Sequence, residues 1–353
     1  MEFIFDHMLL KTCDMKNRFK YIFRLLTVFL IVCSCELKEE DIHEEASQVS
    51  SEKMLPVGGI TLPNTVVNEE TPYGGRAAHT SAVFDDKMWV IAGIRNQFTY
   101  NDVWSSKDGK NWEEVNPNAS FAERYGHAMT VADKNMWIVG GTQGNQYFND
   151  VWRSTNGKDW IQTAKNAPFS ARRWHTLASI ENRIFLIGGL SDNFDVKGDV
   201  WISSDGVQWN LVTNLAPFGR RYGHATVVYD NKIWVIGGYD NNGNYLNDVW
   251  YSINGFQWNL ATASTQFSPR RNHAVTVSEK GMWLTAGIGP KNDYYDDIWF
   301  SQDGIAWEHV NVKKKFPSRG YHTSLYFANK LLVLNGFSLE NGATYFQDLW
   351  GYQ

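Results

Sequence analysis

The chain has 353 residues, of which 15% are aromatic and only 20% are charged, with a formal net charge of −5 at pH 7. This length allows two or three average domains or one large all-β domain, and the 16 Trp and 29 Gly residues favour short strands and tight turns over long helices. A mildly acidic chain without a Lys/Arg cluster argues against nucleic acid as a partner. The last cysteine is Cys35, so a thiol nucleophile or a disulfide is excluded from everything that follows it.

Residues 1–34 are predicted to be a secretory signal, with Met15 as the true start. A basic segment precedes an apolar run from Leu25 to Cys33, which is too short to span a bilayer comfortably. The alternative interpretation, a single membrane-spanning segment, is disfavoured because the apolar run is short. The sequence VCSC, which ends at Cys35, resembles the lipobox of bacterial lipoproteins, and this resemblance implies that Cys35 is the acylated first residue.

Residues 35–57 are predicted to form a flexible acidic tether, because Ser, Glu and His dominate and apolar residues are few. Lys38-Glu39-Glu40 resembles the surface-export signal of lipoproteins in Bacteroidetes-type bacteria, although a plain acidic linker explains it equally well. These features predict an outer-membrane lipoprotein of the cell envelope, either periplasmic or surface-exposed, which contacts the membrane only through its lipid anchor.

Residues 58–353 repeat one unit six times. Its Asp-x-Trp tryptophans, spaced 48 to 51 residues apart, are Trp104, Trp152, Trp201, Trp250, Trp299 and Trp350. About 25 residues before each lies an Arg-x-x-His pair, namely Arg76/His79, Arg124/His127, Arg172/His175, Arg221/His224, Arg270/His273 and Arg319/His322. Six copies of one unit indicate a repeat architecture.

Each unit is predicted to contain four short strands, which in the second copy are 127–133, 135–141, 149–154 and 159–164. Asn-Gly or Asp-Gly turns join the third strand to the fourth, because these dipeptides adopt positive φ easily. The fold class is therefore all-β, a six-bladed β-propeller with four-stranded antiparallel blades. The Gly pair that ends strand two, the following Asp and the spaced Trp resemble the kelch-repeat family over residues 72–353.

Positions that recur in every blade are interpreted as structural. Fifteen of the sixteen tryptophans occupy three repeat positions and are predicted to pack between blades. The repeated Arg, His and Asp residues are expected to hold the blades through Arg–Asp contacts, so neither a metal nor a cofactor is predicted. Because the chain ends after strand three of the sixth unit, residues 58–68 are predicted to supply its outer strand and close the ring.

Function is expected where the blades differ, at the mouth of the ring, which comprises the loops before the repeated histidines and after strand two. The candidate ligand-binding residues are Arg95, Tyr125, Arg173, Trp174, Arg220, Tyr222, Tyr239, Arg271 and Tyr321. Trp174 is the tryptophan outside the repeat positions, so it is predicted to stack on a sugar face and to contribute little to stability. Blade one offers only Ala77-Ala78, which predicts a lopsided mouth.

Three classes of function remain open. The first is a module that binds a glycan or a protein ligand at the cell surface, which is expected to proceed without turnover. The second is a sugar-active enzyme. Galactose oxidase shares the kelch propeller but needs a cysteine, whereas an N-acetylneuraminate epimerase-like enzyme would use a mouth carboxylate, Glu123, Asp192 or Asp240, as base. The third class is a scaffold for another surface protein.

Overall fold

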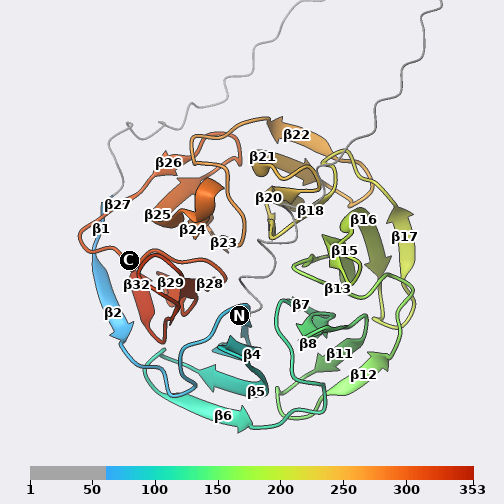
Figure 1. The fold of residues 1–353 in the computed structure, drawn as a ribbon, viewed down its shortest axis with the longest axis horizontal. Coiled ribbons are helices and arrows are strands. Elements are labelled where there is room, and N and C mark those ends of the chain that lie inside the picture. The colour runs from blue at the N-terminus through green and yellow to red at the C-terminus, as the bar shows by residue number, and fades with distance from the viewer. Residues whose placement is uncertain (1–60) are drawn as a thin grey trace, which may run out of the picture. The chain divides into compact units, whose positions relative to one another are not determined.

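A computed structural model describes residues 61–353, which form six antiparallel sheets around a central axis (Figure 1). Within this part of the chain there is no α-helix, only the single 3-10 turn η2 (Pro290–Asn292), and no helix that could span a membrane. The predicted fold class, an all-β six-bladed propeller, is therefore confirmed. The predictions made for residues 1–60, including Cys35, lie outside the described residues.

The blades are numbered in chain order, each from its innermost strand outward. Blade one contains β3 (Thr80–Phe84), β4 (Lys87–Arg95), β5 (Phe98–Ser106) and β6 (Trp112–Asn116); blade two contains β7 (Ala128–Ala132), β8 (Asn135–Val139), β11 (Val151–Ser154) and β12 (Ile161–Ala164). Blade three contains β14 (Thr176–Ile180), β15 (Arg183–Ser191), β16 (Val196–Ser203) and β17 (Asn210–Thr213); blade four contains β19 (Ala225–Tyr229), β20 (Lys232–Asp240), β21 (Tyr245–Ser252) and β22 (Asn259–Thr262). Blade five contains β23 (Ala274–Ser278), β24 (Gly281–Ile288), β25 (Tyr294–Ser301) and β26 (Glu308–His309); blade six contains β28 (Thr323–Phe327), β29 (Lys330–Leu334), β32 (Leu349–Tyr352) and β2 (Asn64–Asn68).

Short strands extend the blades toward the mouth or along the rim. They are β9 (Thr142–Gln143) with β10 (Gln146–Tyr147), β13 (Arg172–Arg173) on β15, β18 (Arg221–Tyr222) on β20, β30 (Phe337–Ser338) with β31 (Thr344–Tyr345), and β1 (Thr61–Leu62) with β27 (Asn311–Val312).

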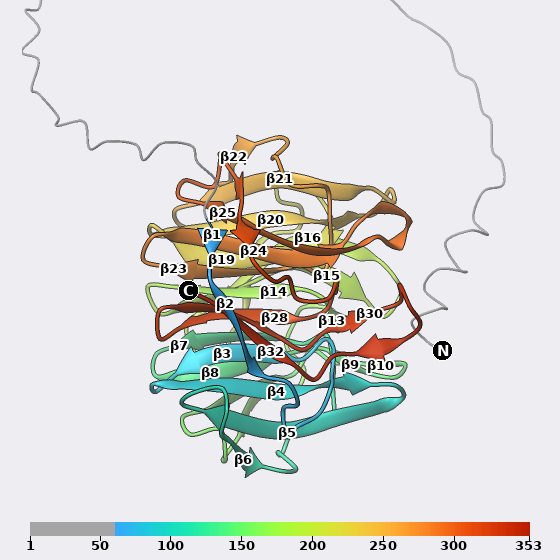
Figure 2. The ribbon, with the colours of Figure 1, turned by 90° about the vertical axis from the view of Figure 1, so that its left-hand side faces the viewer.

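Strand β2 closes the ring by pairing antiparallel with β32, from Asn64 opposite Tyr352 to Asn68 opposite Leu349. The sixth blade is thus built from the two ends of residues 61–353, and Figure 2 shows β2 beside β32. This pairing gives blade six four strands like the other blades and covers the edge of β32, which would otherwise be open to pairing with another chain.

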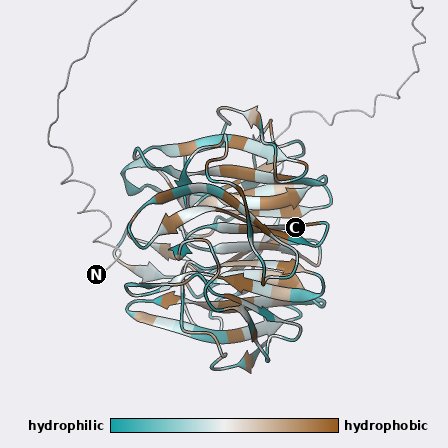
Figure 3. Cartoon of the chain, turned by 90° about the vertical axis from the view of Figure 1, so that its right-hand side faces the viewer, coloured by the Kyte–Doolittle hydropathy of each residue, from teal (hydrophilic) through white to brown (hydrophobic). Residues whose placement is uncertain are grey.

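The cores lie between neighbouring blades, because a propeller blade packs on both of its faces. One apolar cluster joins each adjacent pair of blades; the cluster between blades four and five, for example, contains Trp234, Val249, Phe267, Met282 and Trp307. Apolar residues follow the strands while the connecting loops are largely hydrophilic (Figure 3). The tryptophans at the repeat positions therefore stack the blades, as their spacing predicted.

The hairpin glycines have a second role that the sequence interpretation did not include. Gly255 in the Asn-Gly turn of blade four has φ +80°, but a Cβ there would also lie 2.1 Å from a ring carbon of Phe185 in blade three. Its lack of a side chain is thus required both by the turn and by the close approach of the neighbouring blade.

Candidate functional site

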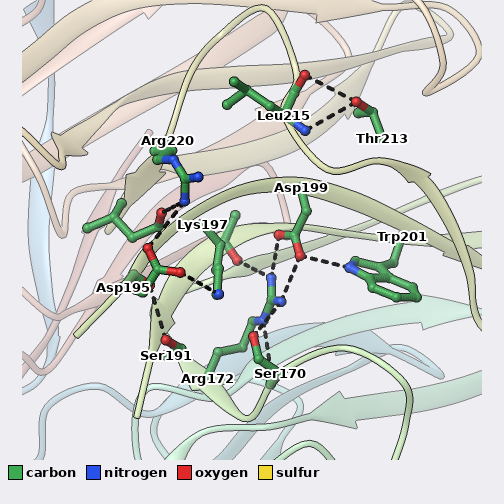
Figure 4. Close-up of polar contacts among 12 residues, drawn as sticks. Ser170, Arg172, Ser191, Asp195, Lys197, Asp199, Trp201, Thr213, Leu215 and Arg220 are labelled. Atoms are coloured by element: carbon green, nitrogen blue, oxygen red, sulfur yellow. Dashed lines mark hydrogen bonds and ion pairs between the residues drawn. The ribbon is translucent and has the colours of Figure 1, made fainter. Parts of the chain in front are cut away.

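The repeated Arg and Asp residues form a buried structural contact in every blade. In blade three, Arg172 Nη1 and Nη2 donate to the two carboxylate oxygens of Asp199 at 2.6 and 2.8 Å, and Trp201 Nε1 donates to Asp199 at 2.8 Å (Figure 4). Arg172 Nη1 also donates to the carbonyl oxygen of Gly188 at 2.8 Å, at the end of strand two. The equivalent pairs are Arg76–Asp102, Arg124–Asp150, Arg221–Asp248, Arg270–Asp297 and Arg319–Asp348. The Arg–Asp contacts predicted from the repeat spacing are confirmed.

The six repeated histidines line a central cavity of about 250 Å³. Four of them contact threonine hydroxyls at 2.8 to 3.0 Å, in the pairs His79–Thr323, His127–Thr80, His224–Thr176 and His322–Thr285. Burial, reinforced by the neighbouring repeat arginine, lowers the pKa of His79, His175 and His273 to about 3. These imidazoles are therefore neutral at pH 7, and no group of three metal-binding side chains occurs in residues 61–353.

A closed ring of backbone hydrogen bonds ends this cavity on the side of the mouth. Each blade contributes the residue before its repeated histidine, in the order Ala78, Gly126, Trp174, Gly223, Asn272 and Tyr321. The amide of each donates to the carbonyl of the one before it at 2.7 to 3.0 Å, and Ala78 donates to Tyr321. All six residues have φ between +51° and +63°. The two glycines adopt this conformation easily, whereas it is unfavourable for the four ring residues that carry a side chain.

Three larger side chains of this ring lie across the cavity and form what we call the floor of the mouth: Trp174, Asn272 and Tyr321. The rings of Trp174 and Tyr321, from opposite blades three and six, approach to 6.0 Å. Trp174 lies over Gly126, where a Cβ would sit 3.1 Å from the indole, and Asn272 lies over Gly223, where a Cβ would sit 2.6 Å from the amide oxygen. The glycines at these ring positions therefore make room for the floor.

Trp174 does not offer the free face that the sequence interpretation gave it. Its side chain is buried, with 7% exposure; the guanidinium carbon of Arg173 lies 3.9 Å from the ring centroid, and Tyr222 stacks on the indole at 5.5 Å. A residue packed in this way supports the mouth from below, so we expect Trp174 to contribute to stability, in contrast to the prediction made from the sequence.

Arg271 lies within a group of tyrosines above the floor. Its guanidinium carbon is 5.3 to 5.9 Å from the ring centroids of Tyr222, Tyr239 and Tyr245, and the Tyr245 hydroxyl forms a hydrogen bond with it. Burial by itself would lower the pKa of Arg271, but the neighbouring tyrosines raise it overall. Burial also raises the pKa of Tyr239. The guanidinium is thus charged and the Tyr239 hydroxyl is protonated at pH 7.

Sequence reasoning missed four tyrosines of the mouth. Tyr147, Tyr245, Tyr294 and Tyr345 each lie three residues before the Asp of the repeated Arg–Asp pair. Tyr245 and Tyr294 start strand three, whereas Tyr147 and Tyr345 lie in the short strands β10 and β31 that precede it. Blades one and three carry Thr99 and Val196 at this position, so a comparison of the repeats one position at a time would have revealed the asymmetry. Burial raises the pKa of Tyr294, whose ring lies 6.4 Å from that of Phe337.

The predicted site residues fall into a connected set and two outliers. Contacts link Tyr125, Arg173, Trp174, Tyr222, Tyr239, Arg271 and Tyr321, with Arg173 donating to the Tyr125 hydroxyl at 3.0 Å. Arg95 is exposed on blade one, and Arg220 pairs with Asp195 at 3.2 Å and with the Val196 carbonyl on the side of blade three (Figure 4). Most of the mouth tyrosines lie on blades four to six together with Arg271, whereas Tyr125 and Tyr147 lie on blade two; the mouth therefore has a side that is rich in tyrosines and a poorer side.

The three carboxylates considered as a catalytic base do not join this set. Glu123 accepts hydrogen bonds from Thr99 and Gln143 at 2.9 Å, and Asp240 accepts from the backbone of its own loop at 2.8 Å. Asp192 is exposed in the loop of blade three. None of them has a contact with Arg271 or with the floor among the described residues.

Six four-stranded blades around an axis, each with its own buried Arg–Asp pair and the last completed by β2 from the start of the domain, define a six-bladed β-propeller. Its sequence matches the family described as the KLHDC2/KLHL20/DRC7 Kelch-repeats domain over residues 61–189 and 174–353. The chain belongs to this kelch-repeat family.

A solved structure, described as the structure of YjhT, has a similar fold. The two proteins share 19% sequence identity, the match covers 80% of this chain and 96% of YjhT, and the TM-score is 0.64. At this identity the similarity shows the fold alone. The search of curated proteins finds no match.

Proposed function

We propose that this kelch propeller is a binding module that recognises a glycan at the rich side of its mouth, without turnover. The observation that supports this proposal is the gathering of tyrosines at positions that differ between blades, with Tyr239, Tyr245 and Tyr345 only partly buried. A tyrosine presents an apolar ring face together with a polar hydroxyl, which suits the alternating faces and edges of a sugar.

The chemistry of the repeated residues favours binding over catalysis. The six Arg–Asp pairs are internal to the blades, the repeated histidines are neutral and buried, and Glu123 and Asp240 already accept hydrogen bonds from neighbouring side chains or from their own loop. A general base must lie within hydrogen-bonding reach of the proton that it removes. The aromatic side chains of the mouth are therefore sufficient for binding, whereas catalysis would also need a suitably placed base.

The test is a glycan array followed by titration of the best binder against the purified protein. Replacing Tyr245 by Ala should weaken binding at least about tenfold, because stacking on an aromatic residue contributes on the order of 1–2 kcal/mol. The matched control is Tyr326→Ala, which removes a tyrosine from β28, away from the mouth. Absence of binding to every glycan would refute the proposal and would leave a protein ligand as the next candidate.

We further propose that the module is an outer-membrane lipoprotein anchored through Cys35. The basic segment, the short apolar run and the VCSC sequence support this assignment. Intact-mass analysis of the protein from membranes should show two or more acyl chains on Cys35, and Cys35→Ala should move the protein to the soluble fraction. An unmodified mature chain would contradict the proposal.

A further inference from the structure

Arg271 differs from the six repeated arginines in the partners that surround it. Each repeated arginine forms a bidentate ion pair with an aspartate, whereas no ion pair among residues 61–353 includes Arg271. Aromatic rings enclose its guanidinium, and its Nε atom is buried without a hydrogen-bond partner among the described residues. Arg271 is partly buried, but aromatic rings enclose its guanidinium and no carboxylate pairs with it, so this position favours an anion from outside the chain.

Two further unpartnered donors lie on the floor beside this group. The Nδ2 of Asn272 and the Nε1 of Trp174 are buried and have no hydrogen-bond partner among the described residues, and the two side chains are 8% and 7% exposed. Trp174 stacks on Tyr222, over whose ring the Arg271 guanidinium lies at 5.8 Å. All three unpartnered groups are N–H donors of mouth residues, with Asn272 next to Arg271 in the chain and the indole nitrogen of Trp174 near Gly126, and each needs an acceptor.

We propose that the ligand of the mouth carries an oxyanion, namely a carboxylate, sulfate or phosphate group, which binds Arg271 and accepts hydrogen bonds from Asn272 and Trp174. This inference rests on the proposed glycan-binding function and makes the ligand an acidic glycan. A neutral sugar hydroxyl would accept from the same donors but would leave the guanidinium charge without compensation. An oxyanion supplies both the acceptors and the charge, and the surrounding tyrosines leave room for the sugar rings.

The experiment compares methyl β-D-glucuronide with methyl β-D-glucoside, which differ in a single carboxylate, by NMR titration of the full protein. We expect the glucuronide to bind at least tenfold more tightly and to shift the indole N–H resonance of Trp174, assigned with Trp174→Phe. Arg271→Gln should remove this preference, since a charge-assisted hydrogen bond accounts for a factor of about ten to a hundred in affinity. The control is Arg183→Gln, whose arginine pairs with Glu181 outside the mouth.

Asn272→Gly provides a second variant that keeps the fold. Asn272 has φ +51°, and two other positions of the same backbone ring already carry glycine, so this change removes the amide without backbone strain. It should weaken glucuronide binding several-fold while the melting temperature of the protein stays close to that of wild type. Titrations with sodium acetate, sulfate and phosphate then identify which oxyanion the donors prefer.

Equal affinity for glucuronide and glucoside, unchanged by Arg271→Gln, would overturn the oxyanion proposal and leave glycan binding standing. Failure of the glucuronide, acetate, sulfate and phosphate alike to shift the Trp174 indole resonance would also overturn it. The proposed function fails on a different result, the absence of any glycan ligand on the array.

Discussion

Asp296 and Asp297 are neighbours on β25, yet their carboxylates have opposite environments. Asp297 accepts two hydrogen bonds from Arg270 at 2.7 and 2.8 Å and one from Trp299 at 2.8 Å. The side chain of Asp297 is 16% exposed and that of Arg270 is 0% exposed. Asp296 pairs with Lys315 at 2.8 Å, with 40% and 48% exposure. The same substitution, Asp to Asn, can therefore be made one residue apart in a buried and an exposed ion pair.

We expect Asp297→Asn to lower the free energy of unfolding by about 3–5 kcal/mol, because it leaves a buried guanidinium without its counter-charge. Asp296→Asn should cost at most about 1 kcal/mol, as exposed pairs do. At about 2–4 °C per kcal/mol for a domain of this order of size, Asp297→Asn should lower the melting temperature by on the order of 10 °C. Urea titration and thermal melts of the two variants measure the difference.

The pH dependence gives a second check on the same pair. Burial alone would raise the pKa of Asp297, but the hydrogen bonds and charge of Arg270, with the Trp299 indole, lower it below its usual value. The stabilisation is thus fully present above the unfolded pKa of about 4 and is lost as the pH falls through the folded value. The difference in the free energy of unfolding between wild type and Asp297→Asn should therefore become smaller as the pH is lowered. If the two variants differ by less than about 1 kcal/mol at pH 7, the repeated Arg–Asp pairs do not stabilise the blades as argued.

Three further predictions concern the ring and the floor. Deleting residues 61–68 should lower the melting temperature by at least about 5 °C, because β2 completes blade six. The control deletion of Asp41–Gln48 should leave the melting temperature unchanged. Equal melting temperatures of the two deletion variants would show that the ring closes without β2. Ala225→Thr should raise the free energy of unfolding by up to about 1 kcal/mol, because the new hydroxyl would contact His273 as the Thr176 hydroxyl contacts His224. The control Ala274→Thr should not raise it, because His322 already contacts Thr285. Equal changes in the free energy of unfolding for both variants would refute the His–Thr pairing. Trp174→Ala should lower the free energy of unfolding by about 3 kcal/mol, measured by urea titration; an unchanged free energy of unfolding would contradict the packing role of Trp174.

The fold of this protein can be predicted from its sequence because the same pattern of residues occurs in six copies, and each copy forms one blade. The Asp-x-Trp and Arg-x-x-His positions recur at a fixed period, and each has a local cause: the Arg–Asp pair and the Trp hydrogen bond that lie within one blade. The outer strand of blade six followed from simple counting, since the last unit ends one strand early and Asn64 lies at the spacing of a fourth strand.

The residues of the mouth contact one another across blades that are distant in sequence. Only the tertiary structure shows which of these residues come together. Trp174 lies outside the repeat positions, which predicts a ring face free to stack on a ligand, but the curvature of the propeller brings it against Tyr321, 147 positions further along the chain, and under Arg173. Arg271 and Arg220 are both mouth arginines by spacing, yet one is enclosed by tyrosines while the other pairs with Asp195. The sequence repeats fix each blade locally, whereas the environment of a loop side chain depends on which neighbouring blades approach it and on the small residues, such as Gly126 and Gly223, that let them do so.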